Sequence, residues 1–421
     1  MSENDITTVF SGGILIDGNG QKPISDAIVI ITGNIIAYAG KASTVEIPQN
    51  VTEIDITGNV IMPGLIDSHV HLQGLLTTDP KELIMVPPEV RAIRSTTDLL
   101  NLLDAGYTAV RDCGDLNAIY LKTAVSEGSI IGPRIFACGT MICQTAGHGD
   151  PFHSLPEEWV IQRGLVEIAD GADQCRQAAR KQLRRGADFI KICTTGGVLS
   201  ERDAPAMSQY TIEEIRALTE TAYAGGVMVS THAQGATGIK NALKAGVDII
   251  EHGSLADDEA IEMMVKQDTM LVPTLSLGRV LASLKPGSGV PALYIDKAKR
   301  VVEEKIKTFD KSWRSGIRIG CGSDFLSDPI SPMGENAVEL EHQVKSGRST
   351  MDVIVSATKI NSQILGAEDR IGTIEKGKLA DLIIIDGNPL EDISILRNRS
   401  KIVRVYKNGK LMPRYTNGKN S

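Results

Sequence analysis

The sequence predicts an α/β fold: a (β/α)8 barrel, or TIM barrel, with a small β-sandwich domain formed by the N- and C-terminal segments. Three observations predict it. The middle of the chain alternates apolar, β-rich runs with helical stretches, both ends consist of short β-branched runs between turns, and 421 residues suffice for one large and one small domain. The expected boundaries are 1–60 and 370–421 for the β-sandwich domain and 61–369 for the barrel.

The terminal segments are expected to pair with each other. Runs at 12–18 and 27–34 near the start, and at 380–387 and 402–409 near the end, are rich in Ile and Val and bounded by Gly or Asn. Neither segment is large enough to bury a hydrophobic core by itself. We therefore expect one small β domain built from both ends of the chain.

The middle segment is expected to form the barrel. Its apolar, β-rich runs lie at 61–72, 107–114, 134–139, 189–197, 227–235, 248–254, 270–277 and 317–325. Helical patterns such as 212–224 and 257–266 separate most of them, which is typical of βα units around buried parallel strands. A doubly wound sheet would favour a Gly-rich turn after the first strand, whereas this strand ends in Asp67-Ser68-His69-Val70-His71. Segment 278–292, with Pro286 and two nearby glycines, is expected to be a mobile loop over one barrel face.

Composition and charge argue against several classes of protein. The net charge of −8 and the lack of clustered Lys and Arg disfavour a nucleic-acid partner. The sequence has no apolar stretch of about 18 residues, and Met1–Asp5 is polar and acidic, so neither a membrane span nor a signal peptide is expected. Six scattered cysteines without a Cys-x-x-Cys pair disfavour a zinc ribbon and suit reduced thiols. We expect a cytoplasmic protein with a small-molecule substrate and no membrane partner.

Four histidines and one aspartate lie at the ends of predicted strands. His69 and His71 are two residues apart, so both imidazoles point to one face of a strand, although a His-x-His pair alone is a weak metal signal. His232, His252 and Asp324 each end a later apolar run. Barrel enzymes place their catalytic groups at this C-terminal rim. One such residue can be explained by a local hydrogen bond, but the whole set predicts a metal centre.

Lys191 lies inside the apolar run 189–193, in the fourth predicted strand. A lysine there is costly to bury unless it is paired or neutralised. In the ordinary interpretation, the amine extends to the strand end and reaches water. In the functional interpretation, the amine reacts with carbon dioxide, and the resulting carbamate is an anionic oxygen ligand that bridges two cations.

Taken together, these residues resemble the amidohydrolase superfamily, and their order is similar to that of its binuclear members. The entry motif at 60–71 and the closing motif at 371–382 carry this resemblance. Segments 144–149, 191–197 and 231–235 are similar to the imidazolonepropionase-like branch. That branch includes metal-dependent prolidases, Arg/Lys carboxypeptidases and ochratoxinase-like amidases. Imidazolonepropionase itself works with one metal and no bridging lysine, so Lys191 argues against that activity.

The resemblance implies a metal-dependent hydrolase that cleaves an amide bond in a peptide or an N-acyl amino acid, as a dipeptidase or carboxypeptidase does. A hydroxide shared by two divalent ions would attack the carbonyl, and Asp324 would act as general acid and base. Zinc is the first choice for these ions, although Mn, Co or Fe fit similar ligands. A homo-oligomer, up to an octamer, is also implied. The implied ligands, with Lys191 N6-carboxylated, are His69, His71, Lys191, His232, His252 and Asp324.

The resemblance also implies that His148, in a glycine-flanked loop, binds the substrate or polarises its carbonyl. Gln234, Tyr210 and Arg202 are further candidate contacts, for a substrate with a free carboxylate. Gln234 is not the Tyr of the prolidase type, which argues against dipeptides ending in proline. Two alternatives remain: a cyclic-amide hydrolase or deaminase of the same superfamily, and a non-catalytic scaffold, which the full ligand set disfavours.

Overall fold

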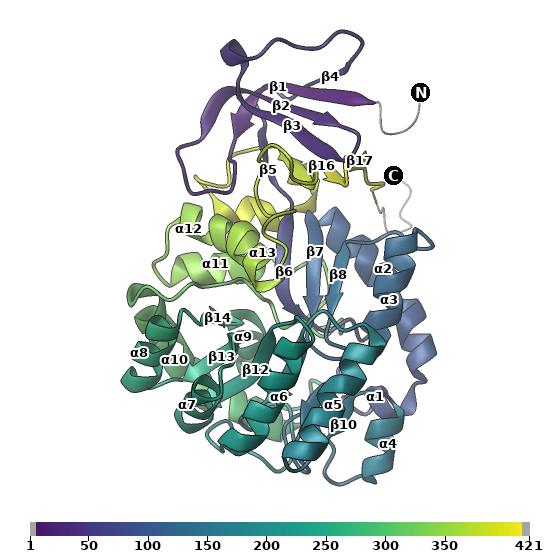
Figure 1. The fold of residues 1–421 in the computed structure, drawn as a ribbon, viewed down its shortest axis with the longest axis vertical. Coiled ribbons are helices and arrows are strands. Elements are labelled where there is room, and N and C mark those ends of the chain that lie inside the picture. The colour runs from purple at the N-terminus through teal and green to yellow at the C-terminus, as the bar shows by residue number, and fades with distance from the viewer. Residues whose placement is uncertain (1–5, 415–421) are drawn as a thin grey trace.

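The N- and C-terminal segments meet in one β-sandwich at one end of the molecule, above the barrel in Figure 1. The computed structural model describes residues 6–414, so the acidic segment 1–5 lies outside the described residues. The strands pair in the order β17-β16-β15-β5-β1-β2-β3, with β4 beside β1. Their bounds are β1 (Thr7–Leu15), β2 (Ile24–Thr32), β3 (Ile35–Lys41), β4 (Thr52–Asp55), β5 (Val60–Pro63), β15 (Leu382–Ile385), β16 (Ile402–Lys407) and β17 (Lys410–Leu411).

The pairing of β5 with β15 joins the two ends of the chain. These strands run antiparallel, with Val60 opposite Ile385 and Pro63 opposite Leu382. β5 extends this sheet to Pro63, beyond the expected boundary at residue 60. Alternate side chains of the paired strands fill a common core. In this core the rings of Phe10 and Tyr406 meet edge to face, with 5.0 Å between their centroids. The two terminal segments therefore share one core, as the sequence predicts.

Parallel strands form the barrel below. The structure places these strands at β6 (Leu65–Val70), β7 (Tyr107–Asp112), β8 (Arg134–Ala137), β9 (Met141–Cys143), β10 (Val166–Ile168), β11 (Ile190–Cys193), β12 (Val229–Gly235), β13 (Ile249–Leu255) and β14 (Met270–Val272). β7 pairs with β6 on one side and β8 on the other, and β11 to β14 pair in sequence order. The backbone N–H of Asp188 donates to Ala137 at 2.9 Å and links β8 to the segment that enters β11.

The last predicted strand, 317–325, closes the barrel through isolated bridges. Ile319 bridges to Leu271 in β14, and Phe325 bridges to Val70 in β6. The backbone N–H of Asp324 donates to the carbonyl of His69 at 2.8 Å. The first and last members of the ring are therefore neighbours, and their functional residues lie side by side.

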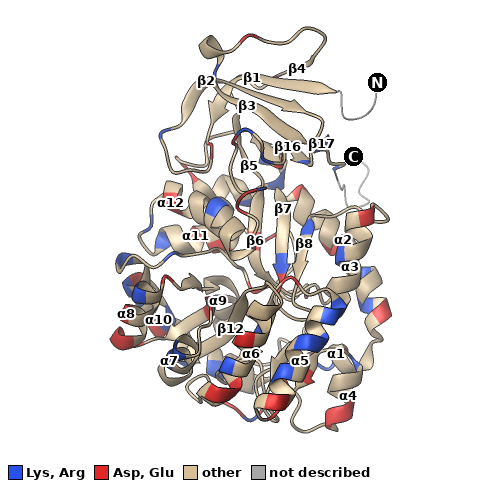
Figure 2. Ribbon diagram, in the orientation of Figure 1, with Lys and Arg blue, Asp and Glu red and all other residues tan. Residues whose placement is uncertain are grey.

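Helices surround the barrel, and Figure 2 shows that they carry most of the charged residues in view, with both signs interspersed. Within residues 6–414, no helix combines the length and hydrophobicity that crossing a membrane requires. The helices are α1 (Glu82–Met85), α2 (Pro88–Asp104), α3 (Asn117–Glu127), α4 (Glu157–Gln162), α5 (Ala172–Arg185), α6 (Ile212–Ala224), α7 (Ala236–Lys244), α8 (Asp258–Gln267), α9 (Leu275–Ser283), α10 (Ala292–Arg314), α11 (Val338–Lys345), α12 (Thr350–Val355) and α13 (Asn361–Ile364).

Local signals explain where two predicted helices begin. Thr211 and Glu214 form a capping box at the start of α6, and the Asp257 side chain caps α8. The expectation of a loop over 278–292 was wrong for its first part, because α9 continues to Ser283. Leu277 and Leu281, one helical turn apart, are buried against α10, and this packing stabilises a helix that contains a glycine.

Candidate metal centre and catalytic cavity

The ends of the barrel strands open into one cavity of about 190 Å³. His69 and His71 come from the end of β6, and His232 and His252 lie within β12 and β13. The structure brings all of the ligands expected from the sequence to this cavity: His69, His71, Lys191, His232, His252 and Asp324.

Asp324 lies beside His69 in β6 and His71 directly after it. Its Oδ1 is 3.2 Å from Nε2 of His69 and 3.4 Å from Nε2 of His71. The ligand atoms of these three residues lie within 4.8 Å of one another. Although burial alone would raise the pKa of Asp324, the charge of His69 and the hydrogen bonds of His69 and His71 hold it well below its usual value. This group can hold a divalent cation.

His232 and His252 form the other side of the centre. Their ring centroids are 4.5 Å apart, and the ring of His252 is 5.2 Å from that of His69. Burial lowers the pKa of both residues well below the usual histidine value, and neighbouring imidazoles add to the effect. Both imidazoles are therefore neutral at pH 7, which is the form that binds a metal ion.

One nitrogen of each of these imidazoles is held by a hydrogen bond, and this fixes which nitrogen faces the cavity. Nδ1 of His69 donates to Glu251 at 2.7 Å, and Nδ1 of His71 donates to the carbonyl of Gly114 at 3.2 Å. Nδ1 of His252 donates to the hydroxyl of Thr274 at 2.7 Å, whereas His232 uses Nε2 to donate to the carbonyl of Gly196 at 3.1 Å. The opposite nitrogen of each ring is then the one available as a ligand, and in His69 and His71 this nitrogen, Nε2, lies beside Oδ1 of Asp324.

Lys191, the sixth candidate ligand, has a buried side chain. Only 2% of the residue is exposed, and its amine has no hydrogen-bond partner among the described residues. A buried amine in this state is energetically costly. The amine lines the same cavity as the four imidazoles and Asp324, so the residues present fit a metal centre that uses Lys191.

Comparison with known proteins agrees with this geometry. The model of the amidohydrolase family matches residues 60–412, which is most of the chain and includes every candidate ligand. The chain belongs to the amidohydrolase family. It is therefore an enzyme, and its His and Asp residues form the metal-binding group typical of amidohydrolases.

Relatives of this amidohydrolase cover nearly its whole length. Ochratoxinase of Aspergillus niger is 32% identical over 424 residues, which cover 96% of this chain and 86% of ochratoxinase. The crystal structure of a Xaa-Pro dipeptidase with bound methionine is 37% identical, with a TM-score of 0.88 over 96% of this chain and 99% of the other. A prolidase complexed with N-methylphosphonate-L-proline is 32% identical, with a TM-score of 0.90 over 97% of this chain and 100% of the prolidase.

In this amidohydrolase, His148 is held beside the metal-binding group. Its ring stacks on that of His232, with 3.9 Å between the ring centroids. Nδ1 of His148 donates to the hydroxyl of Ser200 at 2.9 Å, and that hydroxyl donates to Asp203. Lys297 of α10 pairs with Asp203 at 3.3 Å. Burial lowers the pKa of His148 to about 4, so the imidazole is neutral at pH 7 and its Nε2 is unprotonated.

The other expected substrate contacts divide into two groups. Gln234 lines the cavity, and its side-chain oxygen is buried with no hydrogen-bond partner among the described residues. Tyr210 packs in the barrel core, where its hydroxyl donates to the carbonyl of Ala169 at 3.0 Å. Arg202 lies on an exposed loop. Neither Tyr210 nor Arg202 is among the described residues that line the cavity, because the loop after β11 directs both side chains elsewhere.

Several supporting residues were not identified from the sequence. Glu251 accepts hydrogen bonds from His69, Ser230 and Arg111, all of which are buried. A glutamate inside an apolar strand, directly before His252, is the one local signal that could have identified it. Thr274 has a φ of 47°, which is rare for a β-branched residue, and no sequence pattern marks that conformation.

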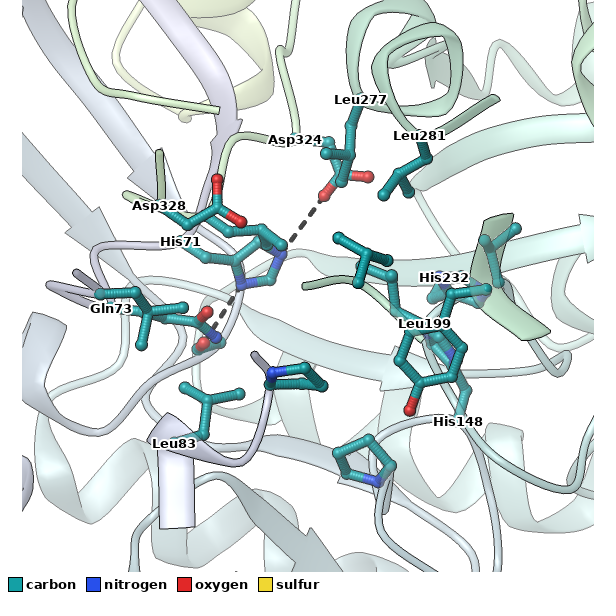
Figure 3. A pocket seen from close by; sticks show the side chains of 18 of the residues that line it. His71, Gln73, Leu83, His148, Leu199, His232, Leu277, Leu281, Asp324 and Asp328 are labelled. Atoms are coloured by element: carbon teal, nitrogen blue, oxygen red, sulfur yellow. Dashed lines mark hydrogen bonds and ion pairs between the residues drawn. The ribbon is translucent and has the colours of Figure 1, made fainter. Parts of the chain in front are cut away.

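Most of the cavity wall is apolar. Figure 3 shows Leu199, Leu277 and Leu281 facing the same space as His71 and Asp324. Other aliphatic and aromatic residues extend this wall around the opening: Leu75, Leu83, Phe152, Val198, Val290, Tyr294, Leu326 and Ile330. Such a lining is suited to a small organic substrate with a large apolar group.

Proposed function

We propose that this amidohydrolase cleaves the amide bond of a dipeptide or an N-acyl amino acid, and that it does so with two divalent metal ions. The observation that carries the proposal is the buried amine of Lys191, which has no hydrogen-bond partner within residues 6–414 and lines one cavity together with four imidazoles and Asp324. A mononuclear centre would need no lysine there. The family relationship and the relatives that are named as dipeptidase, prolidase and ochratoxinase support the same reaction class.

The residues that would hold the ions are the six found at the strand ends. In this proposal, the Lys191 amine attacks carbon dioxide, a nitrogen–carbon bond forms, and one proton leaves to solvent. The carbamate would offer two oxygens that share one negative charge in place of the amine. Zinc is the first choice, because four imidazoles and oxygen donors suit it.

Bound divalent ions would supply a water-derived nucleophile at neutral pH and would polarise the substrate carbonyl. The protein supplies the proton transfers and the positioning. Asp324 is ionised and reaches the cavity, so it can accept a proton from the attacking water and deliver it to the leaving nitrogen. His148 is fixed through Nδ1, which aims Nε2 away from Ser200 for a contact with the substrate.

The lining supports a substrate with a large apolar group on at least one side of the amide. The unpartnered oxygen of Gln234 can accept a hydrogen bond from an N–H group of such a substrate. We also infer that the substrate carries a free carboxylate, as the substrates of carboxypeptidases and dipeptidases do. We further propose a homo-oligomer, which light scattering of the purified protein would test.

The test combines metal analysis with a substrate screen. Protein purified without chelators should contain close to two divalent ions per chain by elemental analysis. A library of dipeptides and N-acyl amino acids should then give turnover, with apolar residues preferred over charged ones. One ion per chain, together with hydrolysis of cyclic amides or deamination alone, would contradict the proposal.

A further inference from the structure

The buried basic residues of this protein divide into paired and unpaired groups. Within residues 6–414, the buried Lys and Arg side chains are Arg91, Arg111, Lys191, Lys297 and Lys305. Three of them each form an ion pair with a carboxylate: Arg91 with Asp115, Arg111 with Glu251, and Lys297 with Asp203. Lys191 and Lys305 have no carboxylate oxygen within 4.0 Å in this part of the chain. Both of these unpaired residues line the catalytic cavity.

An unpaired buried cation requires a compensating partner. For Lys191, the proposed carbamate would replace the basic amine with an anionic group that faces the metal ions. Among the described residues, the Lys305 amine makes no direct contact with a carboxylate: it donates to the carbonyl of Thr274 at 2.6 Å and to the hydroxyl of Thr274 at 3.0 Å, while the charges of Asp324 and Glu339 act on it from farther away. Burial lowers the pKa of Lys305 to about 8, so the amine still carries its proton at pH 7. A positive charge therefore faces the cavity, and one of its three donor hydrogens remains available.

Lys305 is placed to bind a substrate group that lies next to the scissile bond. The hydroxyl of Thr274, which accepts from Lys305, also accepts from His252, so one hydroxyl separates the amine from a metal-binding imidazole. The carboxylate of an amino acid is two bonds from the nitrogen of its N-acyl amide. An anion at Lys305 would thus lie close to an amide held at the metal centre.

The wall beside the amine leaves space for such a group. Gly278 of α9 lines the cavity, and a Cβ added at Gly278 would lie 3.9 Å from the Lys305 amine. A glycine inside a helix costs about 1 kcal/mol relative to alanine, so the sequence keeps an open space there despite that cost. Leu277 and Leu281 line the cavity on the same helix and give this space an apolar border.

We propose that Lys305 binds the free carboxylate of the substrate and selects acids over their uncharged amides. This inference rests on the proposed amide hydrolysis and adds the residue that recognises one end of the substrate. It replaces Arg202 and Tyr210 as the carboxylate contact, because those side chains do not line the cavity.

The first experiment needs no substituted protein. The best substrate from the library is compared with its own primary amide at the carboxyl end, so that only the charge differs. We expect kcat/KM to be roughly 10- to 100-fold higher for the acid, mostly through KM, since a hydrogen bond to a charged group has about this effect. Equal turnover of acid and amide by the wild-type enzyme would overturn the proposal.

The second experiment uses Lys305→Met, with Lys305→Arg as the conservative variant. Lys305→Met should lose the preference for the acid and keep turnover of the amide, while Lys305→Arg should restore part of the preference. A lysine that only supports Thr274 and His252 would instead lower both activities equally and reduce the metal content. Lys307→Met, a substitution of an exposed lysine on the same helix, is the matched control and should change neither value.

Binding of hexanoate and hexanamide separates this inference from the proposed function. In calorimetry, the wild-type protein should bind hexanoate roughly 10-fold more tightly than hexanamide, and Lys305→Met should remove that difference. This result is informative even if no library compound is hydrolysed, an outcome that would reject the proposed function alone. If Lys305→Met fails to fold, Gly278→Ala provides the second route, because the added methyl group narrows the space beside the amine. Unchanged discrimination between hexanoate and hexanamide in Lys305→Met, or in Gly278→Ala if Lys305→Met does not fold, would refute the role of Lys305.

Discussion

Glu251→Gln tests whether the buried network behind His69 sets the affinity of the metal centre. Glu251 accepts from Nδ1 of His69 at 2.7 Å through one oxygen, and its other oxygen accepts from Arg111 and Ser230. Gln has nearly the same shape, but it removes the negative charge and replaces one acceptor with a donor. His69 would then lose the partner that keeps its Nε2 directed at the cavity.

These contacts predict how much Glu251→Gln lowers the metal affinity and the free energy of unfolding. Loss of an outer partner of a ligating histidine lowers metal affinity about 10- to 100-fold. Arg111 is fully buried and would lose its carboxylate, so the free energy of unfolding should fall by about 3–5 kcal/mol. Arg111 also lies over the ring of Phe189 at 4.6 Å, and that contact remains in the variant.

Chelator competition measures the first effect, and urea unfolding of the metal-free protein measures the second. Glu339→Gln is the matched control, because Glu339 is equally buried but bonds to Ser276 and Gln343 rather than to a ligand. We expect the control to keep the metal affinity of the wild type. If Glu251→Gln binds zinc as tightly as the wild type, then Glu251 does not position His69 and the reasoning fails.

Three further predictions concern Lys191, the hydrogen bond to His148 and the pH dependence of stability. Lys191→Ala should fold, lose most of its activity and release part of its metal, because the bridge is removed while the imidazoles and Asp324 remain. Partial recovery with a small carboxylic acid and excess metal would support this, whereas full activity with two ions per chain would show that Lys191 is structural. Ser200→Ala removes one hydrogen bond that orients His148, so kcat should fall roughly 10-fold while the metal content stays unchanged. Steady-state kinetics and elemental analysis measure these two values. A lower metal content would show that Ser200 supports the metal centre and does not only orient His148. Burial raises the pKa of Asp98 from 3.8 to about 7, so the folded protein holds a proton that the unfolded chain has released, and stability falls as pH rises through this range. Asp98→Asn should flatten that decline and be more stable than the wild type above pH 7 in urea unfolding, and parallel curves for the two proteins would contradict this assignment.

The sequence by itself determined the fold class and the candidate ligands of the metal centre. Both depend on local patterns: β-branched runs bounded by turns indicate strands, and a polar residue that ends such a run lies at the rim of a parallel barrel. His69, His71, His232, His252 and Asp324 are all of this kind, and the structure brings them to one cavity. The amidohydrolase family was identified from the same residues and is confirmed.

The tertiary structure alone decided which charges are compensated and which side chains line the cavity. Arg111 and Glu251 are 140 residues apart, and Lys305 is 31 residues from Thr274, so no periodicity within one element predicts these contacts. Tyr210 has a polar neighbourhood in sequence, yet its ring packs in the barrel core. Hydrophobic periodicity specifies which face of an element is buried, but the partners on that face depend on how distant elements pack. For this reason Lys305 carried no signal in the sequence, although its unpaired charge is evident once the barrel is closed.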